Sequence, residues 1–271
     1  MTTTLTNTRT PAGTARFALA LARTSLAAAM AQRGAFLMQA GLMALNNAIF
    51  FTFWIVLLHR VQTIRGYGLR EMTVLYGIVA TGVGLAMICA GGVRQLARVI
   101  HDGELDQVLA QPKPTLLYVL GRKSGAAGVG DLVSGLAMIA LSGAVHLTTA
   151  PMAALAAIAG AVVMVSSGVI FSSAAFWLGP VDAAARQLFE LVITFSVYPE
   201  PLFGGVLRVL LFTLVPAGFV GYVPARVVQA PTVGGAAGLV LVAGAYAGAA
   251  AWVFGRGLRK YCGGSRFEVV G

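Results

Sequence analysis

One aspartate stands in an otherwise apolar stretch of this 271-residue chain and is the first candidate for chemistry. Asp131 ends the string Gly128-Val129-Gly130-Asp131. Two aspartates that face each other in a dry interior can share a proton and activate a water molecule for hydrolysis. That chemistry requires a second carboxylate opposite the first, so the remaining aspartates decide whether Asp131 has a catalytic partner.

The string around Asp131 matches the GxGD pattern of intramembrane aspartyl proteases. The other aspartates are Asp102, Asp106 and Asp182, and all three are predicted to lie near an aqueous surface rather than deep in an apolar segment. We therefore expect Asp131 to be a structural residue, paired or reaching toward water near Arg122 and Lys123. An intramembrane hydrolase built around Asp131 is kept as an alternative.

A second string could bind phosphate, but it lacks the required glycines. Gly121-Arg122-Lys123-Ser124 has Arg122 where a phosphate-binding loop has glycine directly before the lysine, and no second glycine stands five residues earlier. The two cysteines, Cys89 and Cys262, form no disulfide framework, and no metal-ligand cluster surrounds either. We expect this chain to bind neither nucleotide nor metal.

Composition decides where these residues must be positioned. Hydrophobic residues make up 58% of the chain and charged residues only 10%, which no ordinary soluble domain shows. A helix needs about 20 mostly apolar residues to cross the hydrocarbon core. We predict an all-α membrane protein with a single domain over residues 1–271 and six spans, at about 34–58, 73–92, 125–147, 152–178, 182–199 and 233–254.

The basic residues predict the orientation, because lysine and arginine in short loops are retained in the cytoplasm. Of the 19 basic residues, the predicted outer segments hold only Arg60, Arg65, Arg70, Arg208 and Arg226. Both termini are therefore predicted to be cytoplasmic. This bias, together with contact with anionic membrane lipids, explains the net charge of +10, so we expect no nucleic acid partner.

Two segments are predicted to be helical without crossing the membrane in one piece. Residues 14–32 are rich in alanine and leucine and predict an interfacial helix at the inner leaflet. Residues 200–230 are apolar but interrupted by prolines, so we predict a re-entrant hairpin on the outer face, a candidate gate, marked by Tyr198, Pro199, Pro216 and Pro224.

A charged island at residues 94–113 separates the second and third predicted spans. Within it, residues 103–111 predict one short helix, started by a turn at Asp102-Gly103 and stopped at Pro112. Leu105, Val108 and Leu109 form an apolar stripe on that helix. A helix of this length needs something to pack against, and both a surface loop and a helix that docks on a partner subunit fit the pattern.

Polar residues inside spans are costly and therefore candidates for a transport path. Asn46 and Asn47 lie in the middle of the first predicted span, close to Phe50 and Trp54. Glu190 lies in the fifth predicted span, four residues after Arg186, and the two are expected to form a pair. The pairs Gly234 with Gly238 and Gly244 with Gly248 in the last span are expected to pack within the bundle rather than at a subunit interface.

The layout and two strings resemble ABC-2 type transporter permeases. The first string is GELDQVLAQPKP at residues 103–114, and the second is YPEPLFGGVLRVLLFTLVPAGFVGYVP at residues 198–224. The resemblance covers nearly the whole chain in layout. It implies that the island is the coupling helix, which an ATP-binding subunit receives. The coupling residues carried over are Gly103, Glu104, Leu105, Asp106, Leu109 and Pro112.

The resemblance also implies a function and partners. The chain would be the permease of an ATP-driven exporter in the bacterial cytoplasmic membrane, with two ATP-binding subunits, which hold ATP and magnesium, and a second permease, identical or related. The first and fifth spans would line the path, with Asn46, Asn47, Phe50, Trp54 and Glu190 as candidates. The alternatives are the hydrolase around Asp131 and a structural membrane subunit without transport.

Overall fold

The computed structural model describes residues 11–261, and the secondary structure in that range is helical apart from an isolated β-bridge between Ile64 and Tyr67. Long apolar runs form helices because every backbone amide in hydrocarbon must be bonded within its own segment. The longer helices are α1 (Pro11–Met30), α2 (Arg33–Val61), α3 (Leu69–Ala90), α7 (Ala126–Leu141), α8 (Ala150–Ser173), α10 (Asp182–Ser196) and α13 (Val233–Lys260).

Short helical pieces connect the longer helices at both ends of the bundle. They are the 3-10 helix η1 (Gly91–Gln95), α4 (Leu96–His101), α5 (Leu105–Leu109), α6 (Thr115–Gly121), α9 (Ala175–Leu178), the 3-10 helix η2 (Glu200–Leu202), α11 (Gly205–Leu210), the π-helix η3 (Gly218–Tyr222) and α12 (Val223–Gln229). The predicted interfacial helix at residues 14–32 corresponds to α1.

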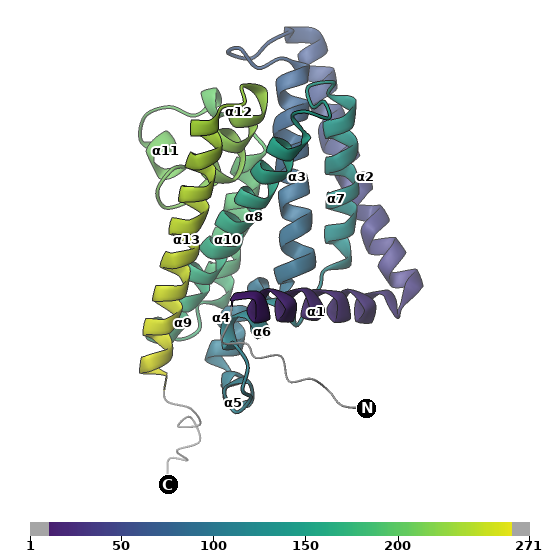
Figure 1. Cartoon of the computed structure of the whole chain (residues 1–271). Helices are drawn as coiled ribbons and strands as arrows, with labels where there is room; N and C mark the ends of the chain where they lie inside the picture. The colour runs from purple at the N-terminus through teal and green to yellow at the C-terminus, as the bar shows by residue number, and fades with distance from the viewer. Residues whose placement is uncertain (1–10, 262–271) are drawn as a thin grey trace.

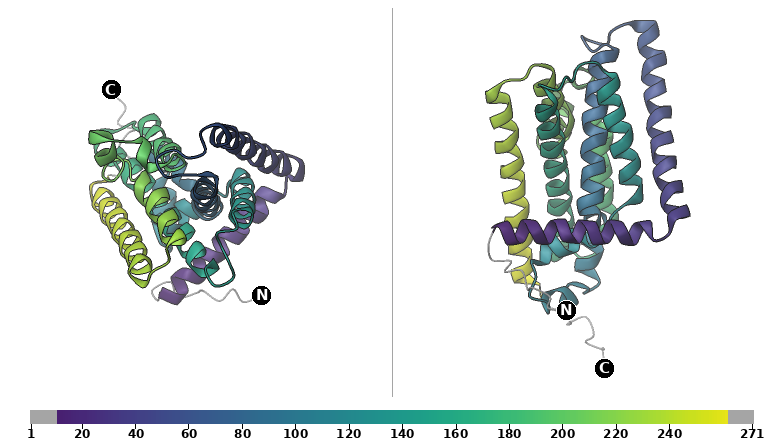
Figure 2. Two further views of the ribbon diagram at one scale, coloured as in Figure 1. Left: turned by 90° about the horizontal axis from the view of Figure 1, so that it is seen from above. Right: turned by 45° about the vertical axis from the view of Figure 1, so that its right-hand side comes forward.

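The long helices run along a common direction, whereas α1 lies across one end of the bundle (Figures 1 and 2). We call this end, which also carries α4, α5 and α6, the α1 end. The opposite end carries α11, α12 and the loop between α2 and α3, and we call it the hairpin end (Figure 1). These two names separate the candidate sites described below.

Four helical stretches in the described range are long and apolar enough to cross a membrane: Arg33–Val61, Leu69–His101, Ala150–Leu178 and Val233–Lys260. A fifth is reached if α6 and α7, bent by 78° relative to each other, count as one span. The helix α10 has 15 residues and ends at Ser196, before the break expected at Pro199. The number six is therefore not reached by length and composition alone.

Two boundaries of the predicted spans differ from the structure. The third span was expected to run to residue 147, but α7 ends at Leu141, because Gly143 adopts a left-handed backbone with φ of +60° that closes the helix. The second was expected to end near residue 92, but helical structure continues through η1 and α4 to His101.

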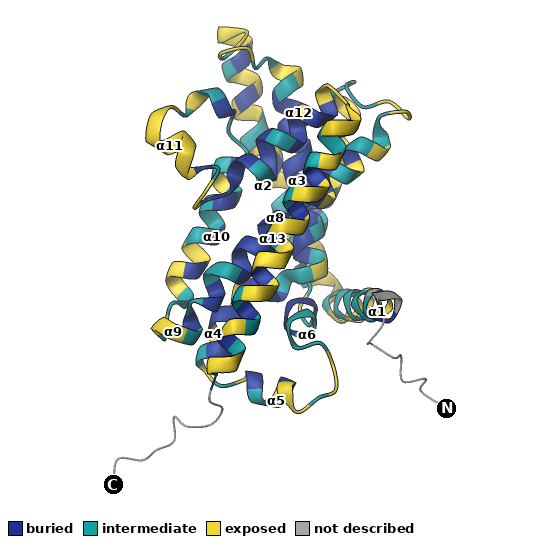
Figure 3. Cartoon of the chain, turned by 60° about the vertical axis from the view of Figure 1, so that its left-hand side comes forward, coloured by how far each residue is buried: buried dark blue, intermediate teal, exposed yellow. Residues whose placement is uncertain are grey.

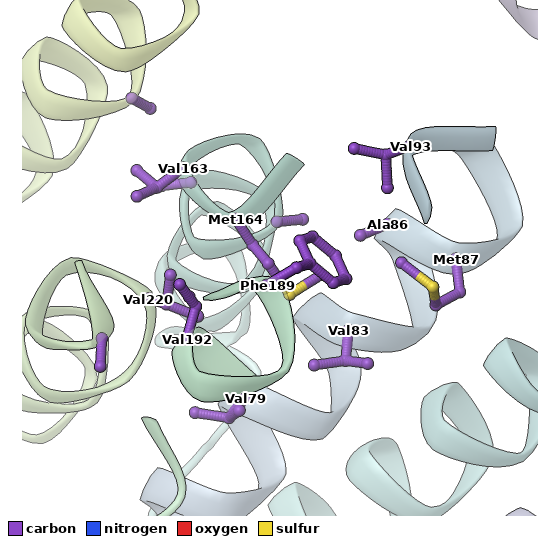
Figure 4. Packing of buried hydrophobic residues seen from close by; sticks show 14 of the residues in the cluster. Val79, Val83, Ala86, Met87, Val93, Val163, Met164, Phe189, Val192 and Val220 are labelled. Atoms are coloured by element: carbon purple, nitrogen blue, oxygen red, sulfur yellow. The ribbon is translucent and has the colours of Figure 1, made fainter. Parts of the chain in front are cut away.

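The core is centred on α3, whose buried face packs against α8 and α10 (Figure 4). The side chains in contact there are aliphatic with one aromatic ring: Val79, Val83, Ala86 and Met87 of α3, Val163 and Met164 of α8, Phe189 and Val192 of α10, and Val220 of η3. Dense packing of this kind, rather than hydrophobic transfer from water, is what holds helices together inside a bilayer.

Glycines bring α3 and α7 unusually close together. A Cβ atom added to Gly84 would lie 2.7 Å from the carbonyl oxygen of Gly128, and one added to Gly130 would lie 2.2 Å from the carbonyl oxygen of Ala40 on α2. The glycines before Asp131 are thus required for helix contact on two sides. The Gly-Val-Gly-Asp string, which suggested hydrolysis, is in this fold a packing motif.

The glycines of α13 behave differently. No atom lies within 4 Å of a Cβ added at Gly234, Gly238, Gly244 or Gly248. The prediction that these pairs pack within the bundle is therefore wrong, because α13 turns this face outward. Its contacts with the bundle are made by other residues, among them Leu239, Ala243 and Phe254.

The segment at residues 200–230 is a chain of short pieces, as the prolines predicted, and not one straight helix. Pro199 precedes η2, Pro216 stands two residues before η3, and Pro224 lies in the first turn of α12. The pieces η3 and α12 pack on α3 and α8, whereas α11 has no buried residue. The limb that contains α11 is attached to the core by the residues that follow it, among them Leu211 and Val215.

Candidate functional site

The charged island forms a protruding turn and a short helix at the α1 end (Figure 3). Gly103 has φ of +79°, a left-handed backbone that favours glycine and ends the helical stretch from α3. The helix α5 covers only Leu105–Leu109, so it is shorter than the predicted helix at residues 103–111. Pro112 and Pro114 then lead the chain into α6.

The apolar stripe of α5 mostly faces its own chain. Leu105 is 0% exposed and Val108 is 3% exposed, and both belong to the core that α6 shares. Leu109, by contrast, is 42% exposed. Part of what this short helix was expected to pack against is therefore its own chain: Leu105 and Val108 hold α5 on the bundle, and Leu109 with the exposed Pro112 remains on the surface.

The two carboxylates of α5 and its turn also have partners within the chain. Arg122 donates to Glu104 at 2.9 Å, which ties the turn to the end of α6. The hydroxyl of Tyr261 lies beside Asp106, and burial, followed by that carboxylate, raises the pKa of Tyr261 to about 12. The ring of Tyr261 packs against Phe176 of α9, so α5 is braced against the ends of α6, α9 and α13.

A cavity of about 180 Å³ lies among α2, α3, α7 and α10. Its lining combines polar, aromatic and aliphatic groups: Met43, Asn46, Asn47, Phe50, Tyr76, Val79, Ala80, Val83, Asp131, Ile193, Thr194, Val197 and Tyr198. The structure thus brings together Asn46, Asn47 and Phe50, which were predicted for the first span, with Tyr198, which was assigned to the outer hairpin.

Asn47 is the centre of a buried polar cluster in this cavity. Its amide nitrogen donates to the Oδ1 atom of Asp131 and to the hydroxyl of Ser134, both at 2.8 Å. Its amide oxygen accepts from the hydroxyl of Tyr76 at 3.0 Å. All four groups face one another across three helices, so each buried polar atom named here has a partner, which is what the interior of a membrane protein requires.

Asp131 therefore pairs with Asn47 and not with the basic residues expected near it. Arg122 is engaged by Glu104, and Lys123 donates to Gln95 at 2.5 Å. Asp131 is also the one carboxylate among the described residues that line this cavity. Asp182 lies at the α1 end, where it accepts from Arg186 at 2.7 Å. The facing pair of aspartates that hydrolysis needs is not present in this lining.

Two other predicted path residues lie outside the cavity lining. Trp54 is 2% exposed and packs edge-on against Tyr198, with ring centroids 5.9 Å apart. It therefore lies behind Tyr198, which lines the cavity, and not in the lining itself. Glu190 pairs with Arg94 of η1 and does not meet Arg186, which pairs with Asp182. The expected pairing of Glu190 with Arg186 is wrong because α10 turns Glu190 toward η1, where Arg94 is available.

The hairpin end contains a charge cluster around a buried carboxylate that was missed from the sequence. Glu200 is 6% exposed and accepts from Arg208 at 2.6 Å and from Arg226. Arg208 belongs to α11 and Arg226 to α12, so one carboxylate connects both limbs of the hairpin. We call Glu200, Arg208 and Arg226 the hairpin clamp. Its signal in the sequence was Glu200 itself, an isolated acid between two prolines in an apolar segment.

The loop between α2 and α3 closes over the same region. Arg65 donates to the carbonyl oxygen of Pro201 at 2.7 Å, and Tyr222 of η3 donates to the carbonyl oxygen of Phe195 on α10 at 2.6 Å. Burial raises the pKa of Tyr67, with the neighbouring charges of Arg226 and Glu200 acting in opposite directions. The hairpin is thereby connected to α2, α3 and α10 around the clamp.

Comparison with known proteins assigns the chain to a family. The family model described as ABC-2 family transporter protein matches residues 44–265. Neither the comparison with curated proteins nor that with solved structures found a match. The match takes in the cavity lining apart from Met43, together with α5 and the hairpin clamp, whereas α1 lies before it. Since the match covers most of the sequence, this multi-pass membrane protein belongs to the ABC-2 family and is an ABC transporter permease.

Proposed function

We propose that this permease moves its substrate outward, driven by ATP hydrolysis in separate subunits. The observation that carries the proposal is the family match over residues 44–265. The complete transporter would contain two ATP-binding subunits, which hold ATP and magnesium, and a second permease, identical or related. The protein would lie in the bacterial cytoplasmic membrane with six spans, both termini and the α1 end facing the cytoplasm, and the hairpin outside.

In this proposal α5 is the coupling helix. Its protrusion at the α1 end supports the assignment (Figure 3). Because Leu105 and Val108 are fixed in the chain's own core and Glu104 is held by Arg122, a push on α5 would move α6 together with α4. The partner would contact the exposed remainder, mainly Leu109 and Pro112, while Gly103 and Asp106 keep the turn in shape.

The cavity among α2, α3, α7 and α10 would be part of the substrate path. Asn46 is exposed, so its amide can form hydrogen bonds with a polar substrate group. Asn47 is buried in the cavity wall, where its amide holds Asp131 and Tyr76. Phe50 and Tyr198 add aromatic surface. The hairpin clamp would hold the outer exit closed until α10 moves, with Pro199 as the break point between α10 and the hairpin.

Co-purification tests the coupling assignment directly. We expect the tagged wild-type permease to bring an ATPase with it from native membranes. Leu109→Asp should weaken that complex about tenfold or more, because an exposed apolar anchor becomes a charge. Leu147→Asp is the matched control, since Leu147 is 94% exposed in the loop after α7, away from α5. The proposal fails if no ATPase accompanies the wild type, or if both variants retain it equally.

A further inference from the structure

A second cavity, separate from the proposed path, lies where α1 crosses the bundle. Its volume is about 380 Å³, and α1, α3, α6 and α8 contribute its walls. The lining is almost entirely hydrocarbon, and none of these residues carries a formal charge: Ala18, Leu21, Leu85, Ala86, Cys89, Ala90, Leu117, Leu120, Gly121, Ile158, Ala161, Val162, Val165 and Ser166. The space is a half-open apolar pocket between the four helices.

Specific contacts between α1 and α6 form one wall of the cavity, which distinguishes it from an incidental gap. Ser25 of α1 donates to the carbonyl oxygen of Gly121 at 2.6 Å. A Cβ added to Gly121 would lie 2.7 Å from the side chain of Leu21. The helix α1 is therefore seated at a fixed place on α6, and the cavity remains open beside that contact.

The occupant of such a cavity must be apolar and long. Water is excluded, because a buried water needs two to four polar partners, and an apolar cavity of roughly 150 Å³ already accommodates benzene while staying dry. Along α8 the lining runs from Ile158 to Ser166, a distance of about 12 Å at 1.5 Å per residue. The cavity thus extends from the level of α1 toward the middle of the bundle.

The charges around α1 identify what the apolar occupant is attached to. Arg16 and Arg23 are exposed and flank Ala18 and Leu21 on α1, and Lys123 is exposed two residues beyond Gly121. The described part of α1 contains no acidic residue. A basic helix lying flat beside an apolar cavity favours a ligand with a phosphate at the surface and hydrocarbon below it.

We propose that this cavity binds one acyl chain of an anionic phospholipid from the leaflet at the α1 end. The phosphate of the lipid lies at the arginines of α1, and its chain extends between α3 and α8 past Cys89. Because α6 packs against both α1 and α5, the lipid braces the element on which α5 rests. This inference rests on the geometry of α1, α3, α6 and α8, and it does not depend on an ATPase partner.

The test is crosslinking in nanodiscs that contain an anionic phospholipid with a photoactivatable acyl chain. Crosslinks should concentrate on Leu21, Cys89 and Ile158. Ala18→Phe should reduce them about tenfold, the loss expected when two methylene groups can no longer be buried. Ala20→Phe is the matched control, because Ala20 is exposed on α1 and does not line the cavity.

A second pair of variants tests the headgroup. Replacing Arg16 and Arg23 by Gln should abolish the preference for the anionic lipid over a zwitterionic one, whereas replacing Arg256 and Arg259, two exposed arginines at the end of α13, should not. The proposal is overturned if crosslinks spread evenly over the exposed faces of α2 and α13, if Ala18→Phe and Ala20→Phe behave alike, or if the anionic preference survives the loss of Arg16 and Arg23.

Discussion

Two buried carboxylates in this permease are stabilised in opposite ways. Asp131, 4% exposed, lies in the middle of the bundle with an amide donor from Asn47. Glu200, 6% exposed, lies at the hairpin end between Arg208 and Arg226, whose own side chains are 59% and 56% exposed. One carboxylate is satisfied by neutral dipoles inside the bundle, and the other by cations that reach out to solvent.

The difference indicates what each group is for. A carboxylate with neutral partners can be exchanged for its amide without leaving a charge behind, since the same acceptor atom remains. A carboxylate that joins two arginines from different segments cannot, because its removal leaves two cations without a partner and separates two pieces of chain. Asp131 is thus part of the cavity lining, whereas Glu200 connects the two limbs of the hairpin through Arg208 and Arg226.

The largest effect is expected for Glu200→Ala. The change removes two charge-assisted hydrogen bonds, each worth roughly 1.5–3 kcal/mol, and the exposure of both arginines offsets part of the loss. We expect the free energy of unfolding to fall by about 3 kcal/mol, measured by denaturant titration in detergent. Glu190→Ala is the control: its ion pair with Arg94 is exposed, so we expect about 1 kcal/mol or less. Equal losses of stability in Glu200→Ala and Glu190→Ala would show that the buried Glu200 contributes no more than an exposed ion pair.

A smaller effect is expected for Asn47→Leu. The variant keeps the number and branching of the side-chain heavy atoms, with a somewhat larger volume, but removes the donor to Asp131 and the acceptor for Tyr76. An unsatisfied buried polar group costs roughly 1–3 kcal/mol, so we expect a loss of about 2 kcal/mol in the same titration. Asn46→Leu, at the exposed neighbour, should leave the stability unchanged. If Asn47→Leu were as stable as the wild type, Asp131 would have another hydrogen-bond partner that replaces Asn47.

The smallest effect is expected for Asp131→Asn. The oxygen of the new amide still accepts from Asn47, so we expect a change within about 1 kcal/mol and transport close to wild type in a complementation assay. The hydrolase alternative predicts the same near-normal stability but a complete loss of function. Loss of function in a stable Asp131→Asn variant would therefore contradict the structural role of Asp131 and favour the hydrolase alternative.

The sequence predicted what depends on local pattern. Apolar length located α2, α3, α8 and α13, the prolines broke the hairpin, and the Asp102-Gly103 turn was placed correctly, because each of these depends on residues adjacent in the chain. The coupling and path residues stay predictions, although the structure brings Asn46, Asn47 and Phe50 to one cavity.

Pairings across the fold could not be predicted in the same way. Arg94 and Glu190 are 96 positions apart, and Asn47 and Asp131 are 84 apart. For Glu190 the nearby Arg186 was an equally good partner on the helix surface, and only the packing of α10 against η1 decided between them. The inward rotation of α5 was hidden for the same reason, since periodicity shows that a helix has an apolar face but not what covers it.

The continuous helical stretch from Leu69 to His101, made of α3, η1 and α4, has a mechanical consequence. Its 33 residues give a rod about 50 Å long at the helical rise, with the tighter 3-10 turns of η1 near one end. The turn at Gly103 directly follows the end at His101. Tyr67, whose pKa is influenced by the charges of Glu200 and Arg226, precedes the end at Leu69. An axial shift of this run would therefore displace both the Gly103 turn and the loop that contacts the hairpin through Arg65, whereas bending would concentrate in the 3-10 turns of η1.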